Sequence, residues 1–458
     1  MKDLANLEIQ KENKMGTKPI GRLLLEISLP MCLSMLVYAC YNIVDSIFVS
    51  RIGEEALTAV SIAFSIQNLM VAVAVGTGVG INSLISKRLG ERCFKEANEA
   101  AMNGLFLALC STAVFTILGF FITPIYFKTQ TQDALILKLG CDYLKIVMIF
   151  SFGLFFEITA GRILLSTGKT FYSMIAQIIG SFINIILDPL LIFGIGIFPK
   201  MGIIGAAIAT VIGQIVGLFF ALFFILTIDH EIKLSLKGFR PSYSVIAKIY
   251  KVGLPSILLA SIGSVMVYFF NLILKAFSDT AVAFLGIYFK LQSFVLLPVL
   301  GLNNGIVAIV AYNYGAKKAE RILETIKIGV IVGFICTAVG FIIIEAIPNL
   351  ILLPFKPTQN MQQIAIAGMR IIATHFLLAS ISITFSSVFQ ALGNGLLSMI
   401  ISFVRQLVVL IPIAYLLSLT KNINMVWLSF PFAEIFSLAL SCFFMVYSYK
   451  KYIKGLKS

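Results

Sequence analysis

The stretch LLLEISLPMCLSMLVYACYNIVDSIFVS, residues 23–50, is apolar over a length that can cross a lipid bilayer as a helix. A helix rises about 1.5 Å per residue, so about 20 residues span a hydrocarbon core roughly 30 Å thick. Runs of this kind recur along the chain, and we expect about twelve transmembrane helices in total. The other eleven are predicted near 56–84, 98–122, 134–158, 171–194, 203–227, 246–275, 281–311, 322–346, 362–388, 396–418 and 424–448.

The overall composition agrees with this interpretation. Of 458 residues, 59% are hydrophobic and 12% are charged, and the mean hydropathy is +1.00. A soluble protein does not have such a composition. Transmembrane barrels are built from short alternating segments rather than long apolar runs, so a barrel is excluded as well. The predicted fold class is an all-α integral membrane protein.

The two halves of the chain are similar when one is shifted by 225 residues along the other. The shift places Leu29-Pro30 on Leu254-Pro255 and Gly80-Ile81 on Gly305-Ile306, and it aligns further glycines at Gly76, Gly90 and Gly168. Glycine and proline in one constant register indicate an internal repeat. Because each half has an even number of spans, the repeat is parallel, and two six-helix lobes are expected around a central cavity.

This repeat predicts the domain organisation. We expect an N-terminal tail over 1–22, a first lobe over 23–227, a linker over 228–245, a second lobe over 246–449 and a C-terminal tail over 450–458. The first 22 residues are polar and carry five cations, so we expect no cleavable signal peptide.

The basic residues predict the orientation of the chain. The formal net charge is +14, and most of the cations flank apolar runs on the side that also holds both tails and the linker. Segments rich in Lys and Arg stay in the cytoplasm, so both termini are predicted to be cytoplasmic in a multi-pass protein of the cell membrane. The charge distribution explains the basic character without nucleic acid as a partner; we expect a monomer in the lipid bilayer.

Two aspartates inside predicted spans are the first candidates for function, because a charge at the bilayer centre costs about 2.5–3.5 kcal/mol on insertion scales. Asp45 lies six residues before Arg51, and Asp188 lies six residues before Gly194. Each is therefore about 9 Å inside the same face of the membrane. Thr210, in the returning sixth span, falls about 12 Å inside that face. One layer of the first lobe can hold all three.

Further polar groups share this layer. Asn184 lies one helical turn before Asp188, and Tyr41 and Asn42 share a helix face with Asp45. Pro189 deprives the carbonyl of Ile185 of its backbone donor. Asp45, Asn184, Asp188 and Thr210 thus form a predicted oxygen-only site for a proton or a sodium ion, the two coupling ions that these ligands allow. The competing interpretation is that each aspartate only bonds to its neighbours and joins helices.

Other polar residues are weaker candidates. Tyr38 and Gln177 lie inward of the predicted ion site and could line a substrate path, as could Gln214. Charged or titratable groups also occur in other spans, and snorkelling toward the membrane surface explains those near span ends. They are Glu157, Lys145, Lys290, Arg370, His375, Arg405 and Glu434, of which Lys290 is predicted to lie deepest.

Motifs for other chemistry do not match. Gly168-Lys169-Thr170 resembles the end of a phosphate-binding loop, but the earlier position that must be glycine is Ile163. Neither a zinc-binding His-Glu-x-x-His nor a Gly-x-Ser-x-Gly elbow occurs. Seven cysteines contain no CxxC pair. We therefore expect no cofactor, no metal beyond sodium and no enzymatic activity.

Several segments of the sequence resemble those of a known family. The segments YNIVDSIFVSRIG (41–53), NIILDPLLIFG (184–194), GIIGAAIATVIGQ (202–214), KLQSFVLLPVLGLNNGIVAIVAYNYGA (290–316) and FQALGNG (389–395) are similar to those of the multidrug and toxic compound extrusion (MATE) family. The resemblance extends along nearly the whole chain. It implies a twelve-helix antiporter that exports cationic or amphipathic drugs against an inward flow of protons or sodium.

Within that family the chain looks most like the branch named for DNA-damage-inducible protein F. The resemblance implies a coupling site in the first lobe, on Asp45, Asn184, Asp188 and Thr210. The norfloxacin-resistance branch also uses acidic residues in the seventh and tenth helices, where this chain has Asn271, Arg370 and His375. An ion site in the second lobe is therefore not expected.

Two alternatives remain at this stage. A flippase for a lipid-linked sugar would share the architecture, but it needs several basic residues for a pyrophosphate, and only Lys290, Arg370 and Arg405 are available. A non-transporting scaffold or receptor would leave the aspartate layer unexplained. The favoured hypothesis is an antiporter in which ion binding neutralises the aspartates and bends helices at Pro30, Pro189 or Pro255.

Overall fold

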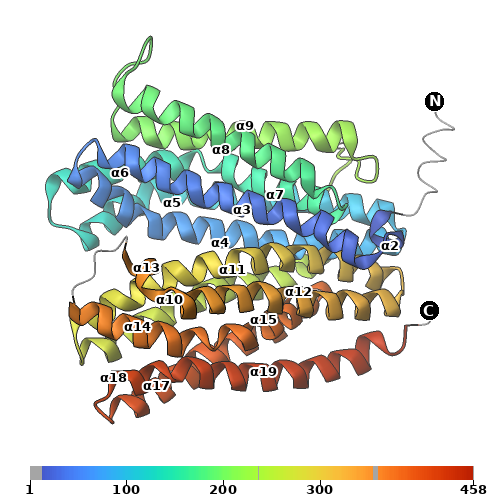
Figure 1. Cartoon of the computed structure of the whole chain (residues 1–458). Helices are drawn as coiled ribbons and strands as arrows, with labels where there is room; N and C mark the ends of the chain where they lie inside the picture. The colour runs from blue at the N-terminus through green and yellow to red at the C-terminus, as the bar shows by residue number, and fades with distance from the viewer. Residues whose placement is uncertain (1–12, 236, 354–358, 457–458) are drawn as a thin grey trace. The chain divides into compact units, whose positions relative to one another are not determined.

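The computed structural model describes residues 13–235, 237–353 and 359–456, which form helices joined by short connections (Figure 1). Residues 1–12 and 457–458 of the predicted tails lie outside the described residues. Within the described part, ten helices are long and apolar enough to cross a membrane, and two bent helix pairs raise the number to as many as twelve. The all-helical membrane fold class is confirmed.

The first half of the chain contains eight helices among the described residues. They are α2 (Lys14–Thr17), α3 (Ile20–Ser50), α4 (Glu54–Gly90), α5 (Phe94–Gln130), α6 (Ala134–Ile149), α7 (Phe152–Ser166), α8 (Thr170–Phe193) and α9 (Ile203–Ile228). Each of the six expected spans corresponds to one of these helices or, for 134–158, to the pair α6 and α7.

The second half begins with long helices and ends with shorter ones. They are α10 (Tyr243–Lys275), α11 (Asp279–Gly315), α12 (Ala319–Ala346), α13 (Pro348–Leu352), α14 (Gln359–Ala373), α15 (Phe376–Ala391), α16 (Gly395–Phe403), η2 (Val404–Leu410), α17 (Ile411–Ser418), α18 (Ile423–Trp427), α19 (Ser429–Ser448) and η3 (Tyr449–Ile453). Helix η3 extends the last span beyond its expected end at 448, so the predicted tail over 450–458 begins inside a helix.

The backbone repeats in the register that the sequence predicts. Helices α6 and α7 meet at 45°, and α14 and α15 meet at 47°. Arg92 and Lys317, 225 residues apart, have φ angles of 58° and 59°. Gly168 and Gly393, again 225 apart, both have φ of 79°. This left-handed conformation suits glycine at the end of a helix, which explains why the repeat retains glycine there.

The chain divides into two compact units, whose boundaries differ from those of the expected lobes. Unit 1 comprises Met1–Thr17 and Leu33–Gly253, and unit 2 comprises Lys18–Cys32 and Leu254–Ser458. The first part of α3 therefore groups with the second half of the chain, and the first part of α10 groups with the first half. One boundary falls two residues after Pro30, and the other falls one residue before Pro255, between Gly253 and Leu254. Proline removes a helix hydrogen bond at both places, which favours a change of partner there.

Glycines bring α8 and α9 of unit 1 close together. A side chain at Gly180 would lie 2.7 Å from the carbonyl oxygen of Gly213, and one at Gly213 would lie 2.8 Å from that of Gly180. Such contact is possible only without a Cβ atom, as in other membrane helix pairs with small residues at the interface. The close approach holds Asn184 of α8 against α9, because Gly213 also faces the Cβ atom of Asn184 at 2.9 Å.

Candidate functional site

Asp45 of α3 and Asp188 of α8 meet inside unit 1. Their carboxyl groups lie within hydrogen-bonding reach of each other. The end of α3 is fixed on α8 by Phe48 and Phe193, whose rings pack edge to face with centroids 6.5 Å apart. Pro189 lies inside α8, as the sequence predicts. The structure thus brings together the two carboxylates that were expected to share a depth.

Asn184 and Thr210 complete this arrangement. The Asn184 amide donates to the Thr210 hydroxyl over 3.5 Å, and that hydroxyl donates to the carbonyl oxygen of Ala206 over 3.0 Å. The exposed fractions are 8% for Asp45, 2% for Asn184, 0% for Asp188 and 5% for Thr210, so bulk water does not solvate any of the four. All the predicted ion-site residues therefore lie in one buried layer, and their role in ion binding stays a prediction.

Tyr143 of α6 is a neighbour that the sequence analysis missed. Its hydroxyl accepts a hydrogen bond from Gln67 of α4 over 3.3 Å and lies within hydrogen-bonding reach of Thr210. The side chain is buried at 2% exposure, and both aspartates act on it electrostatically. A tyrosine in an apolar helix gives no signal of its own in one sequence.

Several oxygen atoms of the site have no partner. They are Oδ1 of Asp45, Oδ1 of Asn184, and both Oδ1 and Oδ2 of Asp188, which are buried and accept no hydrogen bond from any described residue. A buried polar atom without a partner costs about 1–3 kcal/mol, and more when it is charged. The arrangement is therefore suited to a positive ligand that these oxygens can share. A single proton between the two carboxyls or a monovalent cation among the oxygens meets this requirement.

The weaker candidates lie around this layer. The rings of Tyr38 and Tyr41 pack edge to face with centroids 5.2 Å apart, and the Asn42 amide donates to the carbonyl oxygen of Tyr38 over 2.7 Å. Gln177 and Gln214 are half-buried. Asn42 therefore bonds to the backbone of its own helix. The ring contact between Tyr38 and Tyr41 is compatible with either side chain lining a substrate path.

Unit 2 differs in its charged groups. Lys290 of α11 is exposed, and none of the described residues pairs with it. Arg405 of η2 is paired with Glu434 of α19 through Nη1 and Oε2 at 3.0 Å, and Arg370 is paired with Glu345 at 3.3 Å. His375 is buried, with Nδ1 2.6 Å from the carbonyl oxygen of Ile372. Glu434 is nearly inaccessible, so pairing rather than snorkelling explains it.

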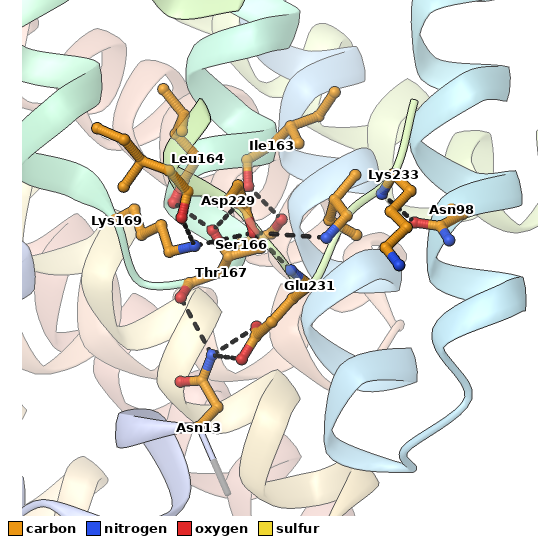
Figure 2. Close-up of polar contacts among 12 residues, drawn as sticks. Asn13, Asn98, Ile163, Leu164, Ser166, Thr167, Lys169, Asp229, Glu231 and Lys233 are labelled. Atoms are coloured by element: carbon orange, nitrogen blue, oxygen red, sulfur yellow. Dashed lines mark hydrogen bonds and ion pairs between the residues drawn. The ribbon is translucent and has the colours of Figure 1, made fainter. Parts of the chain in front are cut away.

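A second acidic group in unit 1 lies beyond the end of α9, and we call it the Asp229 cluster (Figure 2). Asp229 accepts from the Thr167 hydroxyl at 2.6 Å, from the Lys169 ammonium at 3.0 Å, and from the backbone amides of Glu231 and Ile232. The Asn13 amide donates to both carboxylate oxygens of Glu231, at 2.8 and 2.7 Å, and to the carbonyl oxygen of Thr167. The cluster thus joins residue 13, the α7–α8 connection and the segment after α9.

Comparison with known proteins agrees with the fold and the motifs. The sequence matches the MatE family over residues 30–190 and 255–416. It is 27% identical to the multidrug export protein MepA of Staphylococcus haemolyticus over 430 residues, which cover 94% of each chain. It is 25% identical to an FAD transporter of Shewanella oneidensis over 432 residues, covering 93% of this chain and 94% of the relative.

Structural comparison supports the fold. The fold matches an outward-facing multidrug resistance MATE family transporter of the MOP superfamily with a TM-score of 0.88, at 24% sequence identity, covering 96% of this chain and 99% of the other. The two family matches cover the same segment of each half, and together they extend over most of the chain. This protein belongs to the MatE family of multi-pass membrane transporters.

Proposed function

We propose that the protein is a secondary antiporter that exports cationic or amphipathic small molecules and is driven by the inward flow of protons or sodium. The coupling ion binds among Asp45, Asn184, Asp188 and Thr210 in unit 1, as in the branch named for DNA-damage-inducible protein F. One observation carries the proposal: four buried oxygens at this site have no hydrogen-bond partner among the described residues. The named activity of the staphylococcal relative supports export of drugs.

The ion and the substrate compete through charge. With both carboxylates ionised, unit 1 favours a positively charged molecule. When a proton or sodium ion enters from outside, it neutralises the pair and provides the oxygens with the partner they lack, which lowers the attraction for the substrate. A ligand shifts the transporter from one conformation to another only if it binds the two conformations with different affinities.

Helix α3 is suited to transmit this change. It contains Pro30, carries Asp45 in its second part, and passes from unit 2 to unit 1 after Cys32. A helix that lacks a backbone hydrogen bond at proline bends there more easily than elsewhere. Neutralising Asp45 therefore acts on the same helix that connects the two units. Both termini and the Asp229 cluster would face the cytoplasm, following the distribution of Lys and Arg.

The test is export of ethidium from proteoliposomes in which pH and sodium gradients are imposed separately. We expect one of the two gradients to drive export by the wild type and neither to drive it in Asp45→Asn or Asp188→Asn. Asp133→Asn is the matched control, because Asp133 caps α6 by accepting from Leu135 and Ile136, and asparagine also caps well. Full gradient-driven export by both site variants would rule out the proposed coupling site.

A second substrate class deserves a direct comparison, because a relative of similar identity is an FAD transporter. That molecule is an amphipathic metabolite with negative phosphates. Competition between ethidium and FAD in the same vesicles separates the two classes. Inhibition of ethidium export by FAD from the cytoplasmic face would favour a metabolite exporter over a drug exporter.

A further inference from the structure

Unit 2 repeats the helix pair α8 and α9, but it does not repeat their polar residues. The shift of 225 residues places the span Gly395–Ser418 on α8, residue for residue, and places the end of η3 on the end of α9. The equivalents of the four proposed ion ligands of unit 1 are all apolar: Phe270, Val409, Ile413 and Ile435. These four side chains offer an ion no oxygen or nitrogen ligand.

The same helix pair in unit 2 carries a pair of opposite charges instead. Nη1 of Arg405 in η2 lies 3.0 Å from Oε2 of Glu434 in α19. Arg405 lies 10 residues after the start of a 24-residue span, which is about 15 Å along the helix axis and near its middle. The Arg405 side chain is 29% exposed and that of Glu434 is 2% exposed. A charge at this depth is costly, so each depends on the other.

The repeat shows that the charged pair replaces a close helix contact. Arg405 stands at the position of Gly180, where a Cβ atom would lie 2.7 Å from the carbonyl oxygen of Gly213. Glu434 stands at the position of Ala209 in α9. The backbone around Arg405 forms the π-helix η2, and such turns occur often at functional sites. An ion pair therefore joins two helices whose counterparts in unit 1 meet through glycines.

Two other titratable side chains lie beside this pair. The rings of Tyr288 in α11 and His375 before α15 each have their centroid 6.0 Å from that of Phe430, which lies one helical turn before Glu434. Both Arg405 and Glu434 act electrostatically on these two residues. Among the described residues, Arg405 is the only ion-pair partner of Glu434.

Glu434 would need a replacement cation if Arg405 were removed. Its Oε1 atom is buried and already accepts no hydrogen bond from any described residue, as is also true of both oxygens of Asp188. Without the guanidinium, Oε2 would lose its ion-pair partner as well. A buried carboxylate in that condition takes up a proton or attracts a small cation.

We propose that Arg405 is a tethered cation that takes, in unit 2, the place that the coupling ion takes in unit 1, and that it thereby keeps unit 2 out of the ion cycle. The inference rests on the proposed function and names the residue that confines coupling to one unit. Arginine stays charged at every physiological pH, and a cation attached to the chain does not leave. Arg405 is thus a positioning residue that acts through Glu434.

The test asks whether removing the tethered cation creates a second ion site. The full-length background carries Asp45→Asn and Asp188→Asn, so that the site of unit 1 is disabled, and Arg405→Gln is added to it. Melting temperatures are measured in detergent with rising sodium at a fixed alkaline pH, and with falling pH in the absence of sodium. At alkaline pH without sodium, Arg405→Gln should lower the melting temperature by roughly 5–10 °C, because it leaves a buried charge unpaired. Sodium or protons should restore most of that loss.

Three controls separate an ion site from a loss of structure. Arg405→Lys keeps the tethered charge and should create no ion dependence. Arg405→Gln combined with Glu434→Gln removes both charges and should not respond to added ions either. Arg370→Gln is the matched control, because the Arg370 side chain is 52% exposed in its pair with Glu345 and water replaces the lost partner.

Several outcomes would overturn the proposal. A melting temperature of Arg405→Gln that responds to neither ion would show that Arg405 only joins two helices. Failure of Arg405→Gln to fold at low pH and high sodium, where the variant that also carries Glu434→Gln folds, would have the same meaning. A further measurement leaves Arg405 in place: Glu434→Gln is added to the background alone. If the background responds to an ion and Glu434→Gln removes that response, Glu434 binds ions beside its arginine, and the proposal is wrong.

The outcomes also distinguish this inference from the proposed function. If gradients drive export by the wild type and Arg405→Gln gains no ion dependence, only the role of Arg405 is wrong. If no gradient drives export by the wild type and Arg405→Gln still gains ion dependence, the proposed function fails, while Arg405 remains the cation that occupies the site of unit 2.

Discussion

Unit 1 contains two pairs of acidic residues: Asp45 and Asp188, which we call the aspartate layer, and Asp229 and Glu231 of the Asp229 cluster. The two pairs differ in the hydrogen bonds that their carboxylate oxygens accept. Asp229 accepts from four donors, and Glu231 accepts at both oxygens from Asn13. Asp188 has no partner at either oxygen other than the neighbouring carboxyl of Asp45. Asp229, with four donors, therefore stabilises the structure that surrounds it. An acid that lacks partners costs stability until a ligand arrives, and this difference distinguishes a structural site from a site prepared for an ion.

The same substitution at the two sites should have opposite effects on stability, and this is the largest difference that we expect. Asp229→Asn loses the ion pair with Lys169 and turns an amide toward groups that all donate, which should cost about 3 kcal/mol. Asp188→Asn removes a charge that lacks partners, so the melting temperature should stay unchanged or rise. Thermal unfolding in detergent measures both. A lower melting temperature for Asp188→Asn than for Asp229→Asn would reverse the assignment of roles.

The aspartate layer depends on the close approach of α8 and α9, and Gly213→Ala should disturb it. The new methyl group would lie 2.8 Å from the carbonyl oxygen of Gly180 and 2.9 Å from the Cβ atom of Asn184. Overpacking of this kind costs about 1–3 kcal/mol and should separate Asn184 from Thr210. Gradient-driven export should fall at least about tenfold, in line with about 1.4 kcal/mol of lost ion affinity. Gly286→Ala, where a Cβ atom meets no atom within 4 Å, should export normally. Normal export by Gly213→Ala would show that the layer tolerates wider spacing.

Thr210 should contribute less than the carboxylates, because its hydroxyl already donates to the carbonyl oxygen of Ala206. Thr210→Val removes one neutral oxygen, worth about 1 kcal/mol, and should raise the ion concentration for half-maximal export about fivefold. Thr227→Val is matched to it, since the Thr227 hydroxyl makes the same type of bond to Phe223 in the same helix. Identical curves for wild type and Thr210→Val would remove Thr210 from the site.

The Asp229 cluster should show a small dependence of stability on pH. Burial raises the pKa of Glu231, against the opposing effect of Asn13 and of the ammonium groups of Lys169 and Lys14, while the charge of Asp229 raises it further. The folded protein therefore holds this proton to higher pH than the unfolded chain. Its stabilising contribution is complete below the ordinary glutamate pKa and is lost as the pH rises through the raised pKa.

Melting temperatures of wild type and Glu231→Gln, measured from pH 4 upward, test this difference. The wild type should lose stability relative to Glu231→Gln as the pH rises through that window. A parallel pH dependence of the two proteins would show that Glu231 titrates equally in the folded and unfolded states.

Much of the architecture could be predicted, because membrane helices are recorded in the chain as long apolar runs. All twelve expected spans correspond to helices, and the repeat recurs in the backbone at Arg92 and Lys317. The MatE match confirms that the chain is a transporter rather than an enzyme. The proximity of Asp45 and Asp188 agrees with the equal depths that counting residues predicts, since the helical rise is constant.

Other features could not be predicted from one sequence. The division of α3 and α10 between the units depends on which helix each segment contacts, and such contacts leave no periodic signal. Tyr143 lies at the site although the sequence did not indicate it. Lys290, which was predicted to lie deep, is exposed and has no pairing partner among the described residues. Glu157 and Glu434 are both glutamates within predicted spans, and the sequence does not distinguish them. Only Glu434 has an arginine partner within the described chain.

By itself, the sequence determined that this protein lies in the membrane and that it consists of two repeated halves, and it predicted that two aspartates share one depth. Hydrophobicity, register and helical rise are properties of the chain and need no knowledge of neighbouring helices. Only the tertiary structure decided which acids find donors, because a carboxylate is satisfied or left unpaired by side chains from other helices. That distinction separates Asp229 from Asp188, and Glu434 from Glu157.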